Sequence, residues 1–365
     1  MPKPQAKAGI GRIRAHMAEV SGSDLPPAAI RLDSNESAFG PSPHAIAAMQ
    51  AAASGVARYL EAPERLLAPA IAERHRLDPA RIAVGPGSDD LLARLARAYL
   101  DPGTELVRSA NGYPKVPNYA YANDAQAVSA PDTAFRPSVD ALLSAITRKT
   151  RIVYLANPEN PAGTWLDMAE LRRLHAGLPG DVLLVIDGAY EEYVDVPGAE
   201  PTARLVEAAD NVVMTRTFSK LHGLAGARVG WLYGPPDVVE TVRRVGMTFP
   251  VATPSLAAAV AALEDTDHDA RVVSETQRLR GWLSAGLADL GCTVTPSQGN
   301  FVLARLPDCA HDAAAVSATL RRRGISVRTF ASPAFAACLR ITVGPEPDLH
   351  RCLDALNGHL RAAAA

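Results

Sequence analysis

The sequence predicts an α/β protein with a central, mostly parallel sheet and a second, smaller α+β unit. Between about residues 80 and 235, short β-branched runs alternate with helical stretches, as in parallel strands joined by crossover helices. The strand candidates are unbroken apolar runs, which are typical of strands buried on both faces of a sheet. After Pro250 this alternation gives way to longer helical stretches with a few strands between them, which indicates a separate unit.

The elements of the first unit can be placed segment by segment. A helix start is expected at Ser88 and Asp89, because the strand candidate RIAV and the turn GPG precede the helical run DDLLARLARAYL (89–100). The other strand candidates are RIVYLAN (151–157), DVLLVID (181–187), NVVMTRT (211–217) and ARVGWLYG (227–234).

The ends of the chain have a different character. In the second unit we expect a long Ala-, Leu- and Arg-rich helical stretch (255–290), a strand at FVLARL (301–306), another helix, and a strand at CLRITVG (338–344). The segment before about residue 45 is rich in Pro, Gly and Ser and too short for a core of its own. We therefore expect it to lie across another domain or a neighbouring subunit.

Composition limits the class of partner. The 37 Lys and Arg residues nearly balance the 39 Asp and Glu residues, for a net charge of −2 over 365 residues. This balance argues against nucleic acid or an anionic membrane and favours a small molecule. No segment reaches the roughly 20 apolar residues of a membrane span, and the N-terminal segment lacks a signal-peptide pattern, so a cytoplasmic location is expected. We expect no metal site and reduced thiols at Cys292, Cys309, Cys338 and Cys352.

The segment TRTFSKLHGLAGARVGW (215–231) is the most informative for chemistry. A lysine that forms a Schiff base needs a partly desolvated site and donors for an anionic cofactor nearby. Thr217, Ser219 and Arg228 supply such donors around Lys220, and the helix start at Ser88 favours a phosphate. The alternative for Lys220 is an exposed lysine in a loop.

Two upstream segments place polar groups at strand ends. In DGAYEEY, Asp187 ends an apolar strand and Tyr190 follows three residues later. A carboxylate there needs a cationic partner, and a protonated pyridine nitrogen is one. An N-cap or a metal ligand is the alternative for Asp187. In LANPENPAGT (155–164), Asn160 could direct its amide at a ring hydroxyl, or the turn could be purely structural.

Together these motifs resemble the fold type I pyridoxal phosphate (PLP)-dependent aminotransferases of class I and II, and within them the histidinol-phosphate aminotransferase branch. The resemblance runs from LDSNESAFGPSP near residue 32 to LRITVG near 344, through NPENPAG, DGAYEEY, TRTFSK, GLAGARVGW and SQGNFVL. It implies a three-layer α/β/α large domain that binds PLP over 46–265. An N-terminal arm (1–45) and a small domain (266–365) are implied to complete the chain.

The resemblance also implies a role for individual residues. Lys220 matches the lysine that carries PLP as a Schiff base and moves the substrate proton, and Asp187 matches the partner of the pyridine nitrogen. Arg340 matches the arginine that grips a substrate α-carboxylate, and Asn35 lies in a segment that lines the substrate side. The remaining matches are Tyr190 and Asn160 at the ring hydroxyl, Ser88, Asp89, Thr217, Ser219 and Arg228 around the phosphate, Tyr113 stacked on the ring, and Tyr59, which reaches the phosphate of a neighbouring subunit in a homodimer.

The substrate stays open at this point. An amino group would pass between a donor and a 2-oxo acid such as 2-oxoglutarate, and the donor could be histidinol phosphate, an aromatic amino acid or a specialised amine. Arg328 is either a ligand of a substrate phosphate or a solvated surface arginine. The same cofactor could instead support decarboxylation, elimination, cyclisation or oxidation. A PLP-sensing transcription regulator is disfavoured, because the N-terminal segment is too short for a DNA-binding domain and the charge is not basic.

Overall fold

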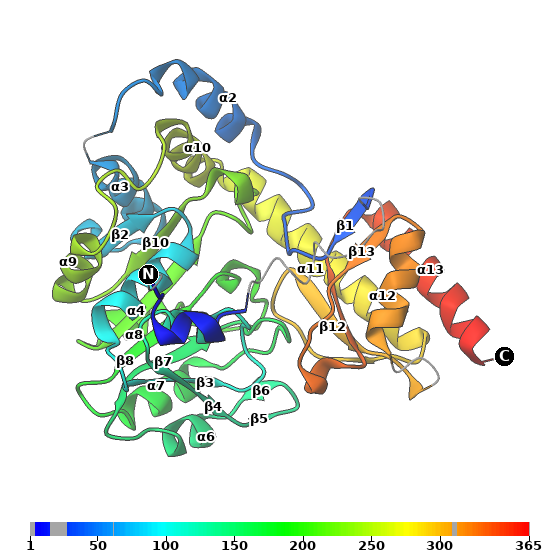
Figure 1. The fold of residues 1–365 in the computed structure, drawn as a ribbon. Coiled ribbons are helices and arrows are strands. Elements are labelled where there is room, and N and C mark those ends of the chain that lie inside the picture. The colour runs from blue at the N-terminus through cyan, green and yellow to red at the C-terminus, as the bar shows by residue number, and fades with distance from the viewer. Residues whose placement is uncertain (1–3, 15–27, 61, 309–311, 365) are drawn as a thin grey trace.

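A computed structural model describes residues 4–14, 28–60, 62–308 and 312–364. The largest element is a seven-stranded sheet in the order β2-β10-β9-β8-β7-β3-β4, which fills the larger part of the molecule in Figure 1. All neighbouring strands run parallel except β10, which is antiparallel to both β2 and β9. The predicted α/β class with a mostly parallel sheet is therefore confirmed. The strands are β2 (Ile82–Gly85), β3 (Glu105–Ser109), β4 (Gln126–Ala130), β7 (Thr150–Ala156), β8 (Leu183–Asp187), β9 (Val212–Thr217) and β10 (Gly230–Tyr233).

Helices cover both faces of this sheet, because its strands are apolar on both sides. In β7, Val153 and Leu155 join one core while Ile152 and Tyr154 join the other. The first face is covered by α2 (Pro43–Ala52), α3 (Pro63–His75), α6 (Val139–Ser144), α7 (Met168–Ala176), α8 (Ala203–Glu207) and α10 (Thr253–Glu264). The second face is covered by α4 (Ser88–Tyr99), α5 (Val116–Tyr121) and α9 (Pro236–Arg244). This gives the three-layer arrangement expected from the family resemblance.

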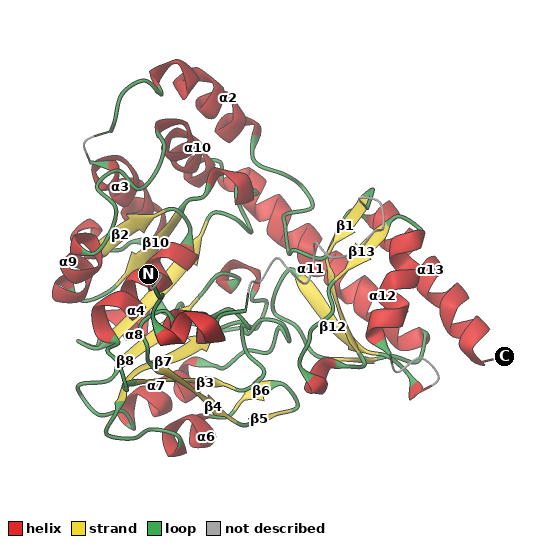
Figure 2. Cartoon of the chain, viewed as in Figure 1, coloured by secondary structure: helices red, strands yellow, loops and turns green. Residues whose placement is uncertain are grey.

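A smaller group of strands and helices stands beside the large sheet (Figure 2). It contains an antiparallel sheet in the order β11-β12-β14 and a parallel pair, β1 with β13. Their buried side chains form a core separate from those of the large sheet. The strands are β1 (Ile30–Leu32), β11 (Thr293–Val294), β12 (Phe301–Arg305), β13 (Ile325–Val327) and β14 (Cys338–Thr342), and the helices are α11 (Thr266–Asp289), α12 (Ala313–Arg322) and α13 (Glu346–Ala364).

The helical stretch expected over 255–290 consists of two helices, since α10 and α11 are separated at Asp265. The Asp265 backbone leaves the helical region, at φ −87° and ψ 69°, and its side chain accepts the N–H of His268 to cap α11. An aspartate inside an apolar helical pattern is a poor helix former but a good N-cap, which explains the break. Figure 1 shows α11 running on from the α10 side of the large sheet to the small sheet.

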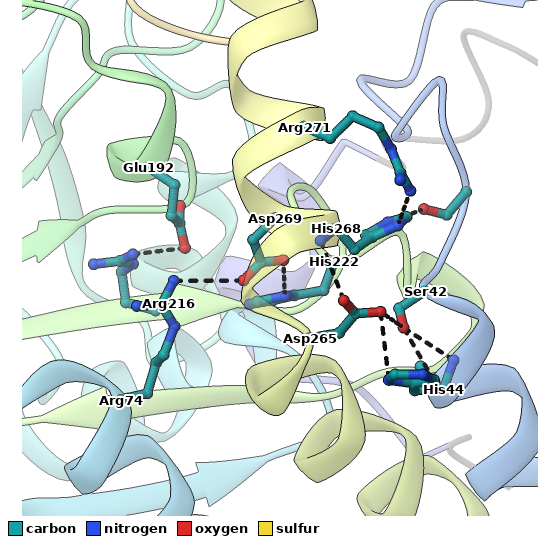
Figure 3. A network of polar contacts seen from close by, with 12 residues as sticks. Ser42, His44, Arg74, Glu192, Arg216, His222, Asp265, His268, Asp269 and Arg271 are labelled. Carbon is teal, nitrogen blue, oxygen red and sulfur yellow. Dashed lines mark hydrogen bonds and ion pairs between the residues drawn. The ribbon is translucent and has the colours of Figure 1, made fainter.

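A polar network fixes the start of α11 to the loop after β9 (Figure 3). His222 and Asp269 are both buried, with His222 Nδ1 3.1 Å from Asp269 Oδ1. Arg74 Nη2 lies 3.7 Å from the other oxygen of Asp269. On the far side of the same turn, the Ser42 hydroxyl donates to Asp265 at 2.5 Å. Segments from the N-terminal part, the large sheet and α11 are thus joined in one place.

The N-terminal segment contacts both parts of the chain. The N–H of Gly9 donates to Asp124 Oδ1 at 2.7 Å, next to α5, and β1 joins the small sheet through β13. Among the described residues, no helix has the length and apolar character needed to span a bilayer. Cys338 and Cys352 are buried free thiols, as expected, Cys292 is buried as well, and Cys309 lies outside the described residues.

Candidate active site

The carboxyl ends of the parallel strands open into a cavity of about 560 Å³. In open α/β sheets this edge is where ligands bind. The structure brings thirteen of the fourteen site residues predicted from the sequence to the wall of this cavity, leaving out Tyr59. They are Asn35, Ser88, Asp89, Tyr113, Asn160, Asp187, Tyr190, Thr217, Ser219, Lys220, Arg228, Arg328 and Arg340.

Asp187 ends β8 and is 6% exposed. Two hydroxyl groups from the neighbouring strands hold its carboxylate: Tyr154 donates to Oδ2 at 3.0 Å and Thr215 donates to Oδ1 at 3.1 Å. Within the described part of the chain, Asp187 forms no ion pair, and burial raises its pKa to about 6. The site therefore favours a cationic ligand beside this carboxylate.

Sequence reasoning missed Tyr154 and Thr215, because each is one residue in an apolar strand. Thr215 lies directly opposite Asp187 in the register of β8 and β9. On the other side Asp187 pairs with Ala156, two residues beyond Tyr154. Only the register of the strands, which the sequence does not give, identifies these two hydroxyls as partners of Asp187.

Lys220 follows β9 and is half-buried, so the exposed-loop alternative does not describe it. Its Nζ donates to the carbonyl of Ser34 at 3.1 Å and lies 5.7 Å from the centre of the Tyr190 ring. Burial lowers the pKa of Lys220 to about 8, and the nearby positive charge of Arg340 acts in the same direction. A lysine with this pKa is partly neutral near neutral pH and can act as a nucleophile or base.

An anion cradle lies at the start of α4. Gly87 has φ 92°, and a Cβ atom built there would lie 2.3 Å from Arg228 Nη2, so the turn passes directly against this guanidinium. Arg228 Nη1 donates to Ser219 Oγ at 3.2 Å, and the Thr217 hydroxyl donates to the same oxygen at 3.0 Å. With Ser88 as the first residue of α4, backbone N–H groups, hydroxyls and a cation converge as phosphate binding requires.

The side chain of Asp89 faces neighbours that the sequence did not suggest. It accepts hydrogen bonds from Lys115 Nζ at 2.6 Å and from the Tyr119 hydroxyl at 2.7 Å. Burial on its own would raise the pKa of Asp89, but the Lys115 ammonium and these hydrogen bonds hold it below the usual value. Tyr113 OH also lies 3.4 Å from Asp89 Oδ1, which orients the tyrosine predicted to stack on the ring.

Tyr190 is held by two asparagines. Asn35 Nδ2 donates to its hydroxyl at 3.0 Å, and Asn160 Nδ2 lies 3.5 Å from the same oxygen. Asn35 adopts φ 53°, and its backbone N–H donates to Thr342 Oγ1 at 3.0 Å. The N-terminal segment, the turn after β7 and the loop after β8 therefore meet at one hydroxyl group.

Arg328 and Arg340 are neighbours across an antiparallel bridge, and both are buried. The surface alternative for Arg328 is therefore wrong, because only 8% of the residue is exposed. Arg340 donates to Asn160 Oδ1 at 2.7 Å and to the carbonyl of Asp33 at 2.6 Å, while its Nε has no hydrogen-bond partner among the described residues. Burial lowers the pKa of Arg340 to about 10. Two buried guanidinium groups in one cavity favour an anionic ligand.

Tyr59 lies outside the cavity of its own chain. It is 78% exposed and stacks on Phe249, with the ring centres 4.1 Å apart. Among the described residues, the other exposed large apolar side chains are Ile10, Ile46, Val56, Leu66, Met247 and Phe249.

Comparison with known proteins places this chain in a family. The family model described as aminotransferase class I and II matches residues 27–356. A histidinol-phosphate aminotransferase of Granulibacter bethesdensis is 42% identical over all of this chain and 98% of its own length. One from Ruegeria pomeroyi is 43% identical over 92% of each chain.

A solved structure agrees with this relationship. The histidinol-phosphate aminotransferase of Sinorhizobium meliloti, solved in complex with pyridoxal-5'-phosphate, superposes with a TM-score of 0.92 at 30% identity and covers 99% of each chain. The family resemblance stated from the sequence is confirmed, and the chain belongs to the aminotransferases of class I and II.

Proposed function

We propose that the protein transfers an amino group between histidinol phosphate or a related amine and a 2-oxo acid such as 2-oxoglutarate, with PLP as its cofactor. The observation that carries this proposal is the position of Lys220 and Asp187 on the wall of one cavity, beside the anion cradle at the start of α4. The identity to proteins named histidinol-phosphate aminotransferase supports the choice of substrate.

The residues present fit this cofactor. The ring nitrogen, when protonated, is the cation that the buried carboxylate of Asp187 lacks, and the cradle of Ser88, Thr217, Ser219 and Arg228 suits its phosphate. Tyr113 would contact the ring face, and Tyr190 with Asn160 would contact the ring hydroxyl. When bound, PLP supplies a carbonyl that takes up the amino group and a ring that withdraws electrons from the substrate.

Lys220 is proposed both to hold the cofactor and to move the substrate α-proton. Its amine donates a hydrogen bond to the carbonyl of Ser34. The loop that carries Lys220 is held in place by the contact of His222 with Asp269. With the pKa of Lys220 near 8, about a tenth of the free amine would be neutral at pH 7. The lysine can therefore accept a proton without leaving the cavity.

The two buried arginines are proposed to bind the anionic groups of the substrates. Arg340, fixed by Asn160 and the backbone of Asp33, would take an α-carboxylate. Arg328 lies beside it and would take the second anionic group, which is a phosphate in histidinol phosphate. Asn35 closes the same side of the cavity.

We also propose a homodimer in which Tyr59 reaches the phosphate of the partner's cofactor. The exposed Tyr59 ring, stacked on the exposed ring of Phe249, supports an interface there. The chain is proposed to divide into a large domain, 46–265, and a small domain, 266–365, preceded by an arm, 1–45; the helix break at Asp265 supports this boundary. Buried free thiols fit a cytoplasmic location.

Replacing Lys220 by alanine is expected to abolish turnover and the visible absorbance band of lysine-bound cofactor, because no other amine would hold PLP in this position. Absorbance spectra and amino-transfer assays of the purified protein measure both. Lys149→Ala, at an exposed lysine, is the matched control and should leave both unchanged. A Lys220→Ala protein that keeps a borohydride-reducible cofactor in the active site would show that Lys220 is not the anchor.

Replacing Asp187 by asparagine should change the pH dependence of stability. The pKa of Asp187 is raised to about 6 in the folded protein, so the folded protein binds the Asp187 proton more tightly than the unfolded chain does. The contribution of this proton to the free energy of unfolding is complete below about pH 4 and is lost as the pH rises through about 6. The wild type should therefore lose about 3 kcal/mol of stability relative to Asp187→Asn over this range. Urea unfolding of the cofactor-free proteins from pH 4 to 8 measures this difference.

The exposed residue Asp181 provides the control, since Asp181→Asn should track the wild type at every pH. In cofactor-loaded protein the loss should be smaller, because Asp187 then has a cation beside it. Identical pH profiles for wild-type and Asp187→Asn protein would mean that Asp187 has an ordinary pKa and no need of a cation.

Substituting Arg340 and Arg328 one at a time should show which arginine binds the substrate carboxylate and which binds the substrate phosphate. Arg340→Ala is expected to raise KM at least about tenfold for an amino acid such as glutamate, and less for an amino alcohol phosphate. Arg328→Ala should raise KM more for the phosphate-bearing amine. Arg305→Ala, at an exposed arginine of β12, is the control. If Arg340→Ala weakens both substrates equally, Arg340 does not select carboxylates.

Mixed dimers test whether Tyr59 acts across the interface. If it does, a dimer of one Lys220→Ala chain and one Tyr59→Ala chain contains one site with both native residues, and cofactor affinity at that site should equal the wild-type value. Light scattering should give twice the chain mass. A monomer, or mixed dimers with no site of native affinity, would contradict the proposed arrangement.

A further inference from the structure

Glu159 is a buried acid to which the proposed reaction gives no role. It is 1% exposed and follows β7 in the turn that carries Asn160. Its backbone is fixed by its own loop, since Glu159 N donates to the carbonyl of Thr164 at 2.8 Å and Gly163 N donates to the carbonyl of Glu159 at 2.7 Å. The side-chain carboxyl group takes no part in these two backbone hydrogen bonds and has contacts of its own.

The contacts of the Glu159 carboxyl group link two walls of the active-site cavity. Glu159 Oε1 accepts the backbone N–H of Asn160 at 2.9 Å, and the carboxyl group also hydrogen-bonds the backbone of Tyr113. A Cβ atom built on Gly112 would lie 2.9 Å from Glu159 Oε2, so the turn before Tyr113 packs directly against the carboxyl group. Asn160 and Tyr113 come from loops after different strands, β7 and β3, and share this one anchor.

The charges around Glu159 keep the carboxyl group close to neutral. Burial raises its pKa to about 8, while the Arg108 guanidinium opposes this shift and the carboxylate of Asp187 adds to it. The Arg108 guanidinium directs its hydrogen bonds to the carbonyls of Ser109 and Ala110 and not to the Glu159 carboxyl group. The Tyr154 hydroxyl also interacts with Glu159, and burial raises the pKa of this tyrosine well above the usual value. At neutral pH a glutamine is therefore the closest mimic of Glu159.

We propose that Glu159 is a positioning residue that fixes Tyr113 and Asn160 relative to each other. Through the hydrogen bond from Arg340 to Asn160, at 2.7 Å, it also fixes the arginine proposed to bind the substrate carboxylate. This inference rests on the proposed function, in which Tyr113 and Asn160 contact PLP. Removal of the carboxyl group would leave two buried N–H groups without their acceptor, so the two loops would shift.

The test compares Glu159→Ala and Glu159→Gln in the full-length protein. Glu159→Ala is expected to raise the dissociation constant of PLP about tenfold, and KM for glutamate by a similar factor. Glu159→Gln should keep both within about twofold of the wild type, because its amide oxygen still accepts a hydrogen bond. Fluorescence titration of the cofactor-free protein with PLP gives the first quantity without any turnover.

Glu170→Ala separates positioning from a loss of stability. Glu170 caps the start of α7 and pairs with Arg136, away from the cavity, so its removal should lower Tm and leave PLP affinity unchanged. If Glu159→Ala folds poorly, Gly112→Ala provides a second route, because the added methyl group would displace the Glu159 carboxyl group. It should weaken PLP binding to a similar extent in the wild type and in Glu159→Gln, because glutamine has the same shape as glutamate and would be displaced in the same way.

Two results would overturn the inference: native PLP affinity and KM in Glu159→Ala with only a lower Tm, or equal losses in Glu159→Ala and Glu159→Gln. Failure of the proposed function gives a different result, because the wild-type protein would then not bind PLP in the titration at all.

Discussion

A carboxylate buried at the end of a sheet strand is the constraint on which the rest of the site depends. Asp187 is surrounded by apolar strands, and the donors that hold its carboxylate are neutral: the hydroxyls of Tyr154 and Thr215 and the backbone of Ala189. Neutral hydrogen bonds offset part of the cost of burying a charge, and the raised pKa of Asp187 reflects what remains. A cationic ring nitrogen in the cavity would remove this cost, so the binding of the cofactor and the ionisation of Asp187 would stabilise each other.

Other side chains of the active site come, like Asp187, from the carboxyl ends of the parallel strands. Parallel strands end at one edge of the sheet, so the loops after β3, β7, β8 and β9 deliver Tyr113, Asn160, Tyr190 and Lys220 to one cavity. The loop that carries Lys220 is fixed to α11 by the buried pair of His222 and Asp269 (Figure 3). The chain runs from α11 into β11 of the small sheet, and Arg340 lies in β14 of that sheet. The loop of Lys220 and the strand of Arg340 are therefore connected through α11.

Much of this arrangement could be predicted from the sequence, because apolar strands, Gly-rich turns and a helix start have local signatures. The position of Asp187 at a strand end and of Ser88 at a helix start follow from such signatures. The partners of these residues could not be predicted, because strand register sets Thr215 against Asp187 and loop packing sets Lys115 against Asp89. The break at Asp265 was missed because capping competes with helix propensity in a way that depends on Ser42 and the start of α11. Tyr59 stays a prediction, since its proposed contact lies in another subunit.

The most direct measurement is peptide mapping of the wild-type protein after its bound cofactor has been reduced with borohydride and the chain has been cleaved with trypsin. If Lys220 holds the cofactor, the cofactor mass appears on the single peptide 217–228, with cleavage after Lys220 blocked by the modification. A label on Lys115 or Lys149, or no labelled lysine in a catalytically active preparation, would show that Lys220 does not hold it.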